Sequence, residues 1–266
     1  MIYSYSRVNQ YLACPRAYRY RYIEGWKEKE TRANLLFGRA FESALGAYFH
    51  GEDSTQHLHD EWAKFRHYDL EYGRAESWDT MFTQGIQLLD RFCQDNRVRI
   101  LDPNSHLQLR VSRQLDRTND FVSYIDAIGE LDGTRSIIEW KTTAARYSEE
   151  PEGLLALDPQ LLCYSWMTGI ADVAMVVFVR KRLPEIQYLT TTITAQQRDQ
   201  YAELVVDTIA QVQAGRFLPR SGIRFPNNGC TTCSFIGLCL CRNDLVHTGL
   251  IRTQGSQLDW IDQLDC

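Results

Sequence analysis

Hydrophobic and polar positions follow a helical period through the first part of the chain. Between residues 4 and 25, apolar residues recur at helical spacing, and Pro15 is expected to kink or split this helix. Further helices are predicted over residues 31–49, 55–66 and 77–97, where apolar residues again recur every three to four positions. The N-terminal part is therefore expected to be mainly helical.

Beyond Pro103 the period shortens to β-type runs that are separated by turn residues. The predicted elements are, in order, a three-stranded meander at 106–115, 121–128 and 136–140, a helix at 153–168, strands at 171–179 and 186–193, and a helix at 195–214. The run 171–179 is apolar throughout, which is typical of a strand buried on both faces. This order of elements predicts an α/β fold.

Composition predicts a folded globular protein rather than a disordered one. The chain has 266 residues, of which 44% are hydrophobic and 24% are charged. One domain is expected, because no Pro-, Gly- or Ser-rich linker divides the chain. The expected parts are a helical part at 1–100, an α/β core at 101–215, a cysteine-rich segment at 216–242 and an acidic tail at 243–266.

Two acidic residues and a lysine on the predicted strands are candidates for chemistry. Asp126 lies among apolar neighbours, where a carboxylate needs a partner. Glu139 and Lys141 are two residues apart, so on a strand they project from the same face. Carboxylates that hold Mg²⁺ or Mn²⁺, with an ammonium nearby, are what metal-assisted phosphodiester hydrolysis requires. The alternative is a solvated surface Glu–Lys pair.

These residues resemble the signature of the PD-(D/E)XK nuclease superfamily, in which an acidic residue is followed by a D/E-x-K strand. The predicted order of helix, meander, helix and strand resembles the core of that superfamily. Gly38 and Glu42 are similar to a RecB-type motif in which a metal-binding His follows Gly by four residues, with Glu42 in place of the His. Gln160 and Tyr164 are similar to the Q-x-x-x-Y motif of the following helix.

The resemblance implies a role for each of these residues. It assigns Asp126, Glu139, Glu42 and the backbone carbonyl of Trp140 to a Mg²⁺ or Mn²⁺ ion, Lys141 to the attacking water or the phosphate, and Gln160 and Tyr164 to the DNA or the lysine. The implied activity is that of a deoxyribonuclease, and more narrowly of an exonuclease on single-stranded ends. A solvated helix residue is the alternative interpretation of Glu42, with His50 as the reserve ligand.

Eight cysteines are present, and four of them fall within residues 230–241. Cys230, Cys233 and Cys239 supply three thiolates, and Cys14 can be a fourth only if the two ends of the fold meet. The pattern resembles the RecB-like exonucleases that carry an iron–sulfur cluster, including CRISPR-associated ones and the nuclease domain of AddB. That resemblance implies a [4Fe-4S] cluster, although four thiolates suit zinc equally. Cys241 could replace Cys239.

The net charge of −5 argues against binding nucleic acid by bulk electrostatics, but it leaves room for a local basic groove. Residues 7–39 contain eight basic residues, only three acidic ones, and interleaved tyrosines. The candidate contacts with single-stranded DNA are Arg16, Arg19, Arg21 and Arg39. A solvated helix face with a tyrosine core stripe is the competing interpretation.

Location and partners are inferred from the two ends of the chain. Neither a secretory signal nor an apolar run of membrane-spanning length is found, which favours the cytoplasm. Residues 257–266 combine acidic residues with an apolar stripe, so this tail is expected to dock on a partner protein or to cover the DNA groove. Two other functions remain open: a catalytically weak or inactive DNA-binding subunit of a DNA-processing or CRISPR-adaptation complex, and a redox sensor.

Overall fold

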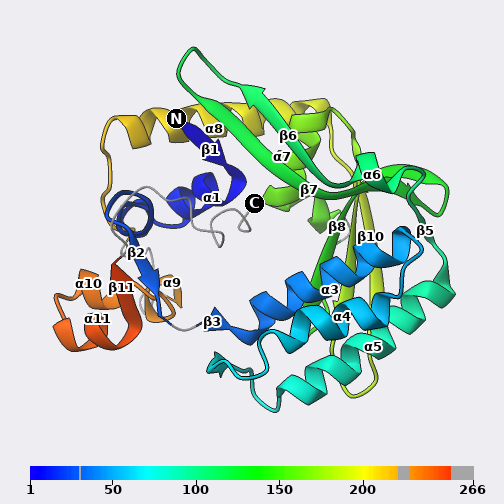
Figure 1. Ribbon diagram of the computed structural model, residues 1–266. Coiled ribbons are helices and arrows are strands. Elements are labelled where there is room, and N and C mark those ends of the chain that lie inside the picture. Colours follow the sequence, from blue (N-terminus) through cyan, green and yellow to red (C-terminus); the bar gives the residue numbers. More distant parts are fainter. Residues whose placement is uncertain (30, 152, 221–227, 253–266) are drawn as a thin grey trace. The chain divides into compact units, whose positions relative to one another are not determined.

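The computed structural model describes residues 1–29, 31–151, 153–220 and 228–252, and the chain forms two compact units (Figure 1). The first unit comprises Met1–Glu30, Ser112–Ser123 and Gln200–Cys266, and the second comprises Thr31–Val111 and Tyr124–Asp199. Both units are assembled from segments that are distant in sequence. This explains why no linker composition marks a boundary between them.

A mixed β-sheet forms the centre of the second unit. Its strands are β7 (Asp120–Leu131, in this unit from Tyr124 onward), β8 (Thr134–Thr143), β9 (Asp172–Val179) and β10 (Glu185–Thr192). β8 is antiparallel to β7 and parallel to β9, while β10 is antiparallel to β9. β5 (Val98–Arg99) and β6 (Leu107–Gln114) pair with β7. The mixed sheet and its helices confirm the predicted α/β fold class.

The turn between β7 and β8 sets the register of the site. Asp132 and Gly133 both have positive φ angles, of 52° and 82°, which is the backbone geometry of a tight type I′ hairpin turn. Asp132 also accepts a hydrogen bond of 3.0 Å from Nε of Arg97. The hairpin aligns Ala127 with Ile138, and both residues are fully buried.

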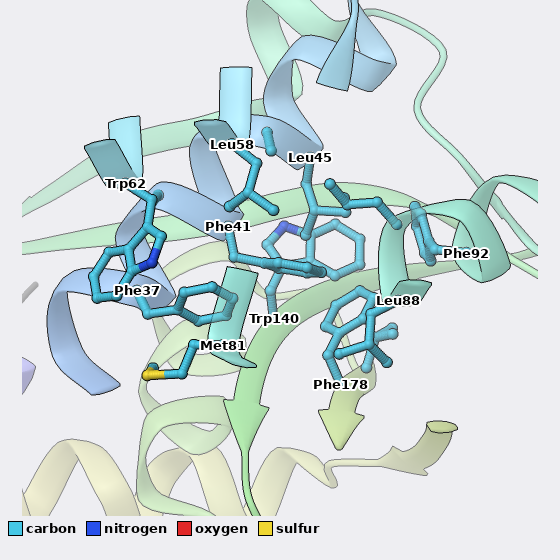
Figure 2. Packing of buried hydrophobic residues seen from close by; sticks show 14 of the residues in the cluster. Phe37, Phe41, Leu45, Leu58, Trp62, Met81, Leu88, Phe92, Trp140 and Phe178 are labelled. Atoms are coloured by element: carbon cyan, nitrogen blue, oxygen red, sulfur yellow. The ribbon is translucent and has the colours of Figure 1, made fainter. Parts of the chain in front are cut away.

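Three helices cover one face of this sheet: α3 (Ala33–Phe49), α4 (Ser54–Ala63) and α5 (Trp78–Asp95) (Figure 1). Figure 2 shows Trp140 of β8 and Phe178 of β9 pointing toward Phe41 and Phe92 of these helices. The rings of Phe41 and Phe178 are 4.7 Å apart between centroids. This aromatic cluster fixes which face of β8 is turned toward the core.

Helix α7 (Pro159–Thr168) follows the short 3-10 helix η2 (Leu154–Leu157). The sequence predicted a single helix over 153–168, but the structure interrupts it at Asp158. The Asp158 side chain accepts hydrogen bonds from the backbone N–H groups of Gln160 and Leu161, and Pro159 occupies the first helical position. A new helix therefore begins at Pro159.

The N-terminal part of the first unit is broken at the predicted proline. β1 (Ile2–Ser4) pairs in parallel with the start of β7 and was not predicted. It is followed by α1 (Tyr5–Ala13), α2 (Pro15–Tyr18) and the π-helical turn η1 (Arg19–Ile23). The expected single helix is therefore split, because Pro15 lacks the N–H that would continue α1.

The two ends of the described chain meet in the first unit. β2 (Trp26–Glu28) pairs antiparallel with β11 (Leu250–Arg252), beside the short C-terminal helices (Figure 1). These short helices are α9 (Asn228–Thr231), α10 (Ile236–Cys239) and α11 (Asn243–Gly249). The remaining elements are the long helix α8 (Ala195–Gln213) and, in the second unit, β3 (Thr31–Arg32), β4 (Leu70–Glu71) and α6 (Pro103–His106). No helix in the described part of the chain is long and apolar enough to cross a membrane.

Candidate active site

The two faces of β8 carry different chemistry. Ile138 and Trp140 belong to the hydrophobic core, so Glu139 and Lys141 project from the opposite face of the strand. On β7, Ala127 is likewise a core residue, and its neighbour Asp126 points the other way. The alternation therefore brings the three predicted catalytic side chains to one face, as the sequence pattern required.

A chain of hydrogen bonds connects β8 with α7. The ammonium group of Lys141 donates to Oε1 of Glu139 and, over 2.8 Å, to Oε1 of Gln160. The amide nitrogen of Gln160 donates in turn to the hydroxyl of Tyr164 over 2.7 Å. Gln160 and Tyr164 are one turn apart on α7 and lie on the same side of it. The structure thus joins four of the predicted site residues in one network.

Asp126 is anchored by the backbone of β8. Its Oδ2 accepts a hydrogen bond of 2.8 Å from the N–H of Trp140. Burial, followed by repulsion from Glu139 and Glu42, raises the pKa of Asp126 well above its ordinary value. Burial and the charge of Glu139 also raise the pKa of Glu42. Three carboxylates therefore lie close enough to one another to disfavour their simultaneous ionisation.

Lys141 remains a cation in this surrounding. Its burial opposes the charge, but the neighbouring Glu139 carboxylate outweighs that effect and raises the pKa of Lys141. Burial and the charges of Glu139 and Asp126 raise the pKa of Tyr164 as well. At neutral pH the site therefore offers an ammonium donor and a neutral phenol.

Gln108 was not predicted from the sequence as part of this site. Its side-chain nitrogen donates to Oε1 of Glu42 over 3.3 Å, and its backbone has a φ of 47°, in the left-handed region. A glutamine at the start of a strand carries no motif that would announce this geometry. Glu42 is therefore oriented by β6 as well as by its own helix.

Comparison with known proteins identifies the family. The sequence pattern of the PD-(D/E)XK nuclease superfamily matches residues 2–240. The chain belongs to the PD-(D/E)XK nuclease superfamily. No curated protein resembles the sequence closely enough to count as a match.

Two solved structures are similar to this chain at low sequence identity. The crystal structure of a candidate exonuclease from Eubacterium rectale matches with a TM-score of 0.52 and 15% identity, covering 97% of this chain and 91% of that one. A second solved structure matches with a TM-score of 0.42 and 15% identity, covering 90% of this chain and 85% of that one. At this identity the first match supports the fold alone.

PD-(D/E)XK nucleases use divalent metal ions, and carboxylate oxygens are the ligands that such ions prefer. Within the described residues, no group of three or more His, Cys, Asp or Glu side chains is arranged so that it could hold a metal ion. However, Oε2 of Glu139 is buried without a hydrogen-bond partner, and Asp126 and Glu42 repel it. A hard cation prefers oxygen ligands and would relieve this repulsion. The backbone carbonyl of Trp140 stays a predicted further ligand.

The raised pKa of Asp126 predicts how stability depends on pH in the absence of metal. Above the ordinary pKa of 3.8 the unfolded chain loses the Asp126 proton, whereas the folded protein keeps it up to a higher pH. The contribution of this group to the free energy of unfolding is therefore fully present below pH 3.8, and it is lost as the pH rises through the higher pKa of the folded state. In EDTA at pH 8, Asp126→Asn is expected to be more stable than the wild type by at least about 1 kcal/mol. Thermal melts at pH 4 and pH 8 measure this difference.

Two comparisons make this measurement specific to the site. Asp69→Asn removes a carboxylate from an exposed position and should leave the melting curve unchanged at both pH values. Mn²⁺ should stabilise the wild type at pH 8 more than it stabilises Asp126→Asn. A variant that is less stable than the wild type at pH 8 in EDTA would contradict the repulsion between these carboxylates.

The four predicted cluster cysteines lie near one another in the first unit. Cys14 and Cys233 both pack against a small hydrophobic cluster that contains Phe235. Burial raises the pKa of the Cys233 and Cys239 thiols, and the charges of Cys14 and Cys230 raise both further. These thiols are therefore within electrostatic reach of one another.

The other cysteines differ in their surroundings. Cys241 is exposed, as Cys239 is, and has a left-handed φ of 55°, while Cys93 and Cys163 lie on α5 and α7 in the second unit. Cys266 and the predicted docking tail at 257–266 lie outside the described residues. No three cysteines of the described chain are arranged so that they could hold a metal ion, and the choice of Cys14, Cys230, Cys233 and Cys239 as cluster ligands stays a prediction.

The four candidate DNA-binding arginines are not equivalent. Arg19 pairs with Glu24 over 2.8 Å, and Arg16 acts on the pKa of Cys239, which it lowers in opposition to burial. Arg21 lies over the ring of Tyr22, 5.6 Å from its centroid. Arg39 lies on α3 in the second unit, with a buried guanidinium whose charge acts on Glu42. DNA contacts by all four residues stay predictions.

Proposed function

We propose that this protein is a Mg²⁺- or Mn²⁺-dependent deoxyribonuclease that acts as an exonuclease on single-stranded ends. The observation that carries the proposal is the network in which Lys141 bonds both Glu139 and Gln160, beside the backbone-anchored Asp126. Carboxylates, an ammonium and a hydrogen-bonding amide on one strand face are the groups that phosphodiester hydrolysis needs. Membership of a nuclease superfamily supports the same activity.

Each side chain has a distinct part in the proposed mechanism. Asp126, Glu139 and Glu42 would hold the divalent ion, which when bound supplies an activated water and offsets charge on the phosphate. Lys141 donates a hydrogen bond from a permanent cation, because its raised pKa prevents it from acting as a general base at neutral pH. Gln160 holds the ammonium in place through its carbonyl oxygen.

One observation supports exonuclease action, and another supports a single-stranded substrate. The Eubacterium rectale structure with a similar fold bears the name of a candidate exonuclease. Tyr11 and Tyr18 of the N-terminal helices are buried in the core, but the partly exposed Tyr20 and Tyr22 lie among Arg16, Arg19 and Arg21, and accessible aromatic rings beside basic groups bind unstacked bases and phosphates.

We infer further that Cys14, Cys230, Cys233 and Cys239 hold a structural [4Fe-4S] cluster, as in the RecB-like nucleases that the sequence resembles. Four sulfur donors that lie within electrostatic reach of one another support this assignment. Such a cluster would hold the two ends of the fold together, where β2 also pairs with β11. Zinc in the same four-thiolate site is the alternative outcome.

The activity is tested by cleavage of labelled DNA with the purified full-length protein. Single-stranded, double-stranded and flapped substrates are incubated with Mn²⁺, with Mg²⁺ and with EDTA. Single-stranded DNA should be degraded progressively from an end in either metal, and EDTA should stop the reaction. Degradation that continues in EDTA, or that starts at internal positions only, contradicts the proposal.

A second function is favoured by Glu42, which stands where RecB-type motifs have a histidine. A carboxylate at this position adds a third negative charge beside Asp126 and Glu139, and burial, followed by the charge of Glu139, raises the pKa of Glu42. The protein would then be a weakly active or inactive DNA-binding subunit. Tight DNA binding without cleavage in either metal supports this second function over the first.

A further inference from the structure

A cavity of about 700 Å³ lies in the second unit beside the proposed active site. Its wall comes from residues 146–149 and 153–159, between β8 and α7, and its floor comes from β9 and β10. Residues that line it include Tyr147, Leu154, Leu157, Asp158, Met175 and Leu189. This volume is within the range of pockets that take small organic groups.

The floor of the cavity lies on the same face of the sheet as the candidate catalytic residues. Met175 is the register partner of Glu139 on the neighbouring strand, and Leu189 is the register partner of Met175. Adjacent strands are about 4.8 Å apart, so the floor begins one strand away from a proposed metal ligand. Tyr147 also lies within electrostatic reach of Lys141: burial lowers the pKa of Lys141, whereas Glu139, Asp126 and, least of the three, Tyr147 raise it.

The wall of the cavity is held in place by a buried glutamine of β10. Oε1 of Gln187 accepts a hydrogen bond of 2.9 Å from the N–H of Tyr147, and its Nε2 donates to the carbonyl of Tyr147 over 3.2 Å. The same nitrogen donates to Glu149 over 2.8 Å. The backbone of Tyr147 is therefore fixed from both sides before any ligand arrives.

The side chains on this wall are unusually open to solvent for their type. Tyr147 is 38% exposed, and Leu154 and Leu157 are 40% and 68% exposed. Exposed apolar side chains that line a preformed cavity indicate a binding surface rather than a packing defect. Asp158 adds a polar group, since its carboxylate lies at the start of α7.

We propose that this cavity accepts the unpaired nucleobase of the nucleotide that adjoins the scissile phosphate, with the base stacked on Tyr147. The inference rests on the proposed nuclease function, because it places the phosphate of that nucleotide beside Glu139 and Lys141. An aromatic ring with apolar neighbours binds the face of any base, whereas a base paired within a duplex cannot leave its stack without cost. The cavity would therefore select unpaired ends.

The first test measures cleavage of single-stranded oligonucleotides that carry one abasic site at successive positions, with the full-length protein and Mn²⁺. The wild type should cleave about tenfold more slowly where the base that enters the cavity is missing. Tyr147→Ala should cleave the intact oligonucleotide at that reduced rate and show no further loss with the abasic one. Tyr147→Phe should keep the discrimination, since it keeps the ring.

A matched control and a binding measurement complete the test. Tyr68→Ala removes a tyrosine that is 62% exposed and does not line the cavity, so it should behave as the wild type. In EDTA, an oligonucleotide containing the fluorescent base 2-aminopurine should lose emission on binding to the wild type, and lose less on binding to Tyr147→Ala.

The outcomes separate the pocket from the proposed activity. An equal abasic-site penalty in the wild type and Tyr147→Ala overturns the pocket and leaves the nuclease function standing. If nothing is cleaved, quenching that depends on Tyr147 supports the pocket while removing the nuclease function. Quenching that is equal in both proteins, or an absence of binding, overturns the pocket.

Discussion

Replacing Lys141 with alanine is expected to reduce DNA cleavage by at least about 100-fold while leaving DNA affinity close to that of the wild type. The ammonium group bonds Glu139 and Gln160, and it is the side-chain cation that the proposed mechanism assigns to the reacting phosphate, beside the divalent ion. Its loss leaves Glu139 without its partner and the developing negative charge without a donor. Single-turnover cleavage with Mn²⁺ and fluorescence anisotropy with labelled single-stranded DNA measure the two quantities.

Lys181→Ala is the matched control for this change. Lys181 is a partly exposed lysine in the turn between β9 and β10, and it pairs with Glu185 over 2.5 Å. Replacing it with alanine changes the net charge of the protein by the same amount as Lys141→Ala. This variant should cleave DNA at the wild-type rate. If Lys141→Ala cleaves as fast as Lys181→Ala, the active site has been assigned to the wrong face of β8.

Replacing Cys233 with serine is expected to remove the proposed cluster and to lower the free energy of unfolding by about 4 kcal/mol. The estimate follows from chain closure, since a cluster would join Cys14 to residues more than two hundred positions later in the chain. The wild-type protein should be brown and contain iron and sulfide, and the variant should be colourless. Metal analysis, visible absorbance and denaturant titration measure these effects.

Cys241→Ser separates the cluster from a general effect of losing a thiol in this segment. Cys241 is an exposed thiol two residues after Cys239, and the resemblance does not select it as a ligand. It should retain the colour, iron content and stability of the wild type. A zinc-containing wild type would replace the iron–sulfur assignment, and an unchanged stability of Cys233→Ser would contradict ligation altogether.

The placement of the candidate catalytic residues on β7 and β8 could be predicted because the pattern is local. Asp126, Glu139 and Lys141 are separated by short distances in sequence, and strand alternation alone places the last two on one face. The superfamily resemblance then added Gln160, which accepts a hydrogen bond from Lys141, and Tyr164, which accepts one from Gln160; no spacing rule could supply either contact.

Contacts between distant segments could not be predicted in the same way. β2 and β11 have three residues each and lie at opposite ends of the chain, so neither has a readable period. Gln108 depends on a left-handed backbone conformation that glutamine rarely adopts. Tyr147 depends on a buried glutamine forty residues later, and that pairing leaves no trace in the local sequence.

The alternation along β8 separates the packing that keeps this protein folded from the proposed catalytic groups. Trp140 packs with Phe178 and Phe92 in the core, while its neighbours Glu139 and Lys141 take no part in that packing. Substitutions on the proposed catalytic face are therefore expected to leave the aromatic cluster undisturbed, whatever they do to activity. The fold can persist after its chemistry is lost, so a well-folded preparation is by itself no evidence of an active enzyme.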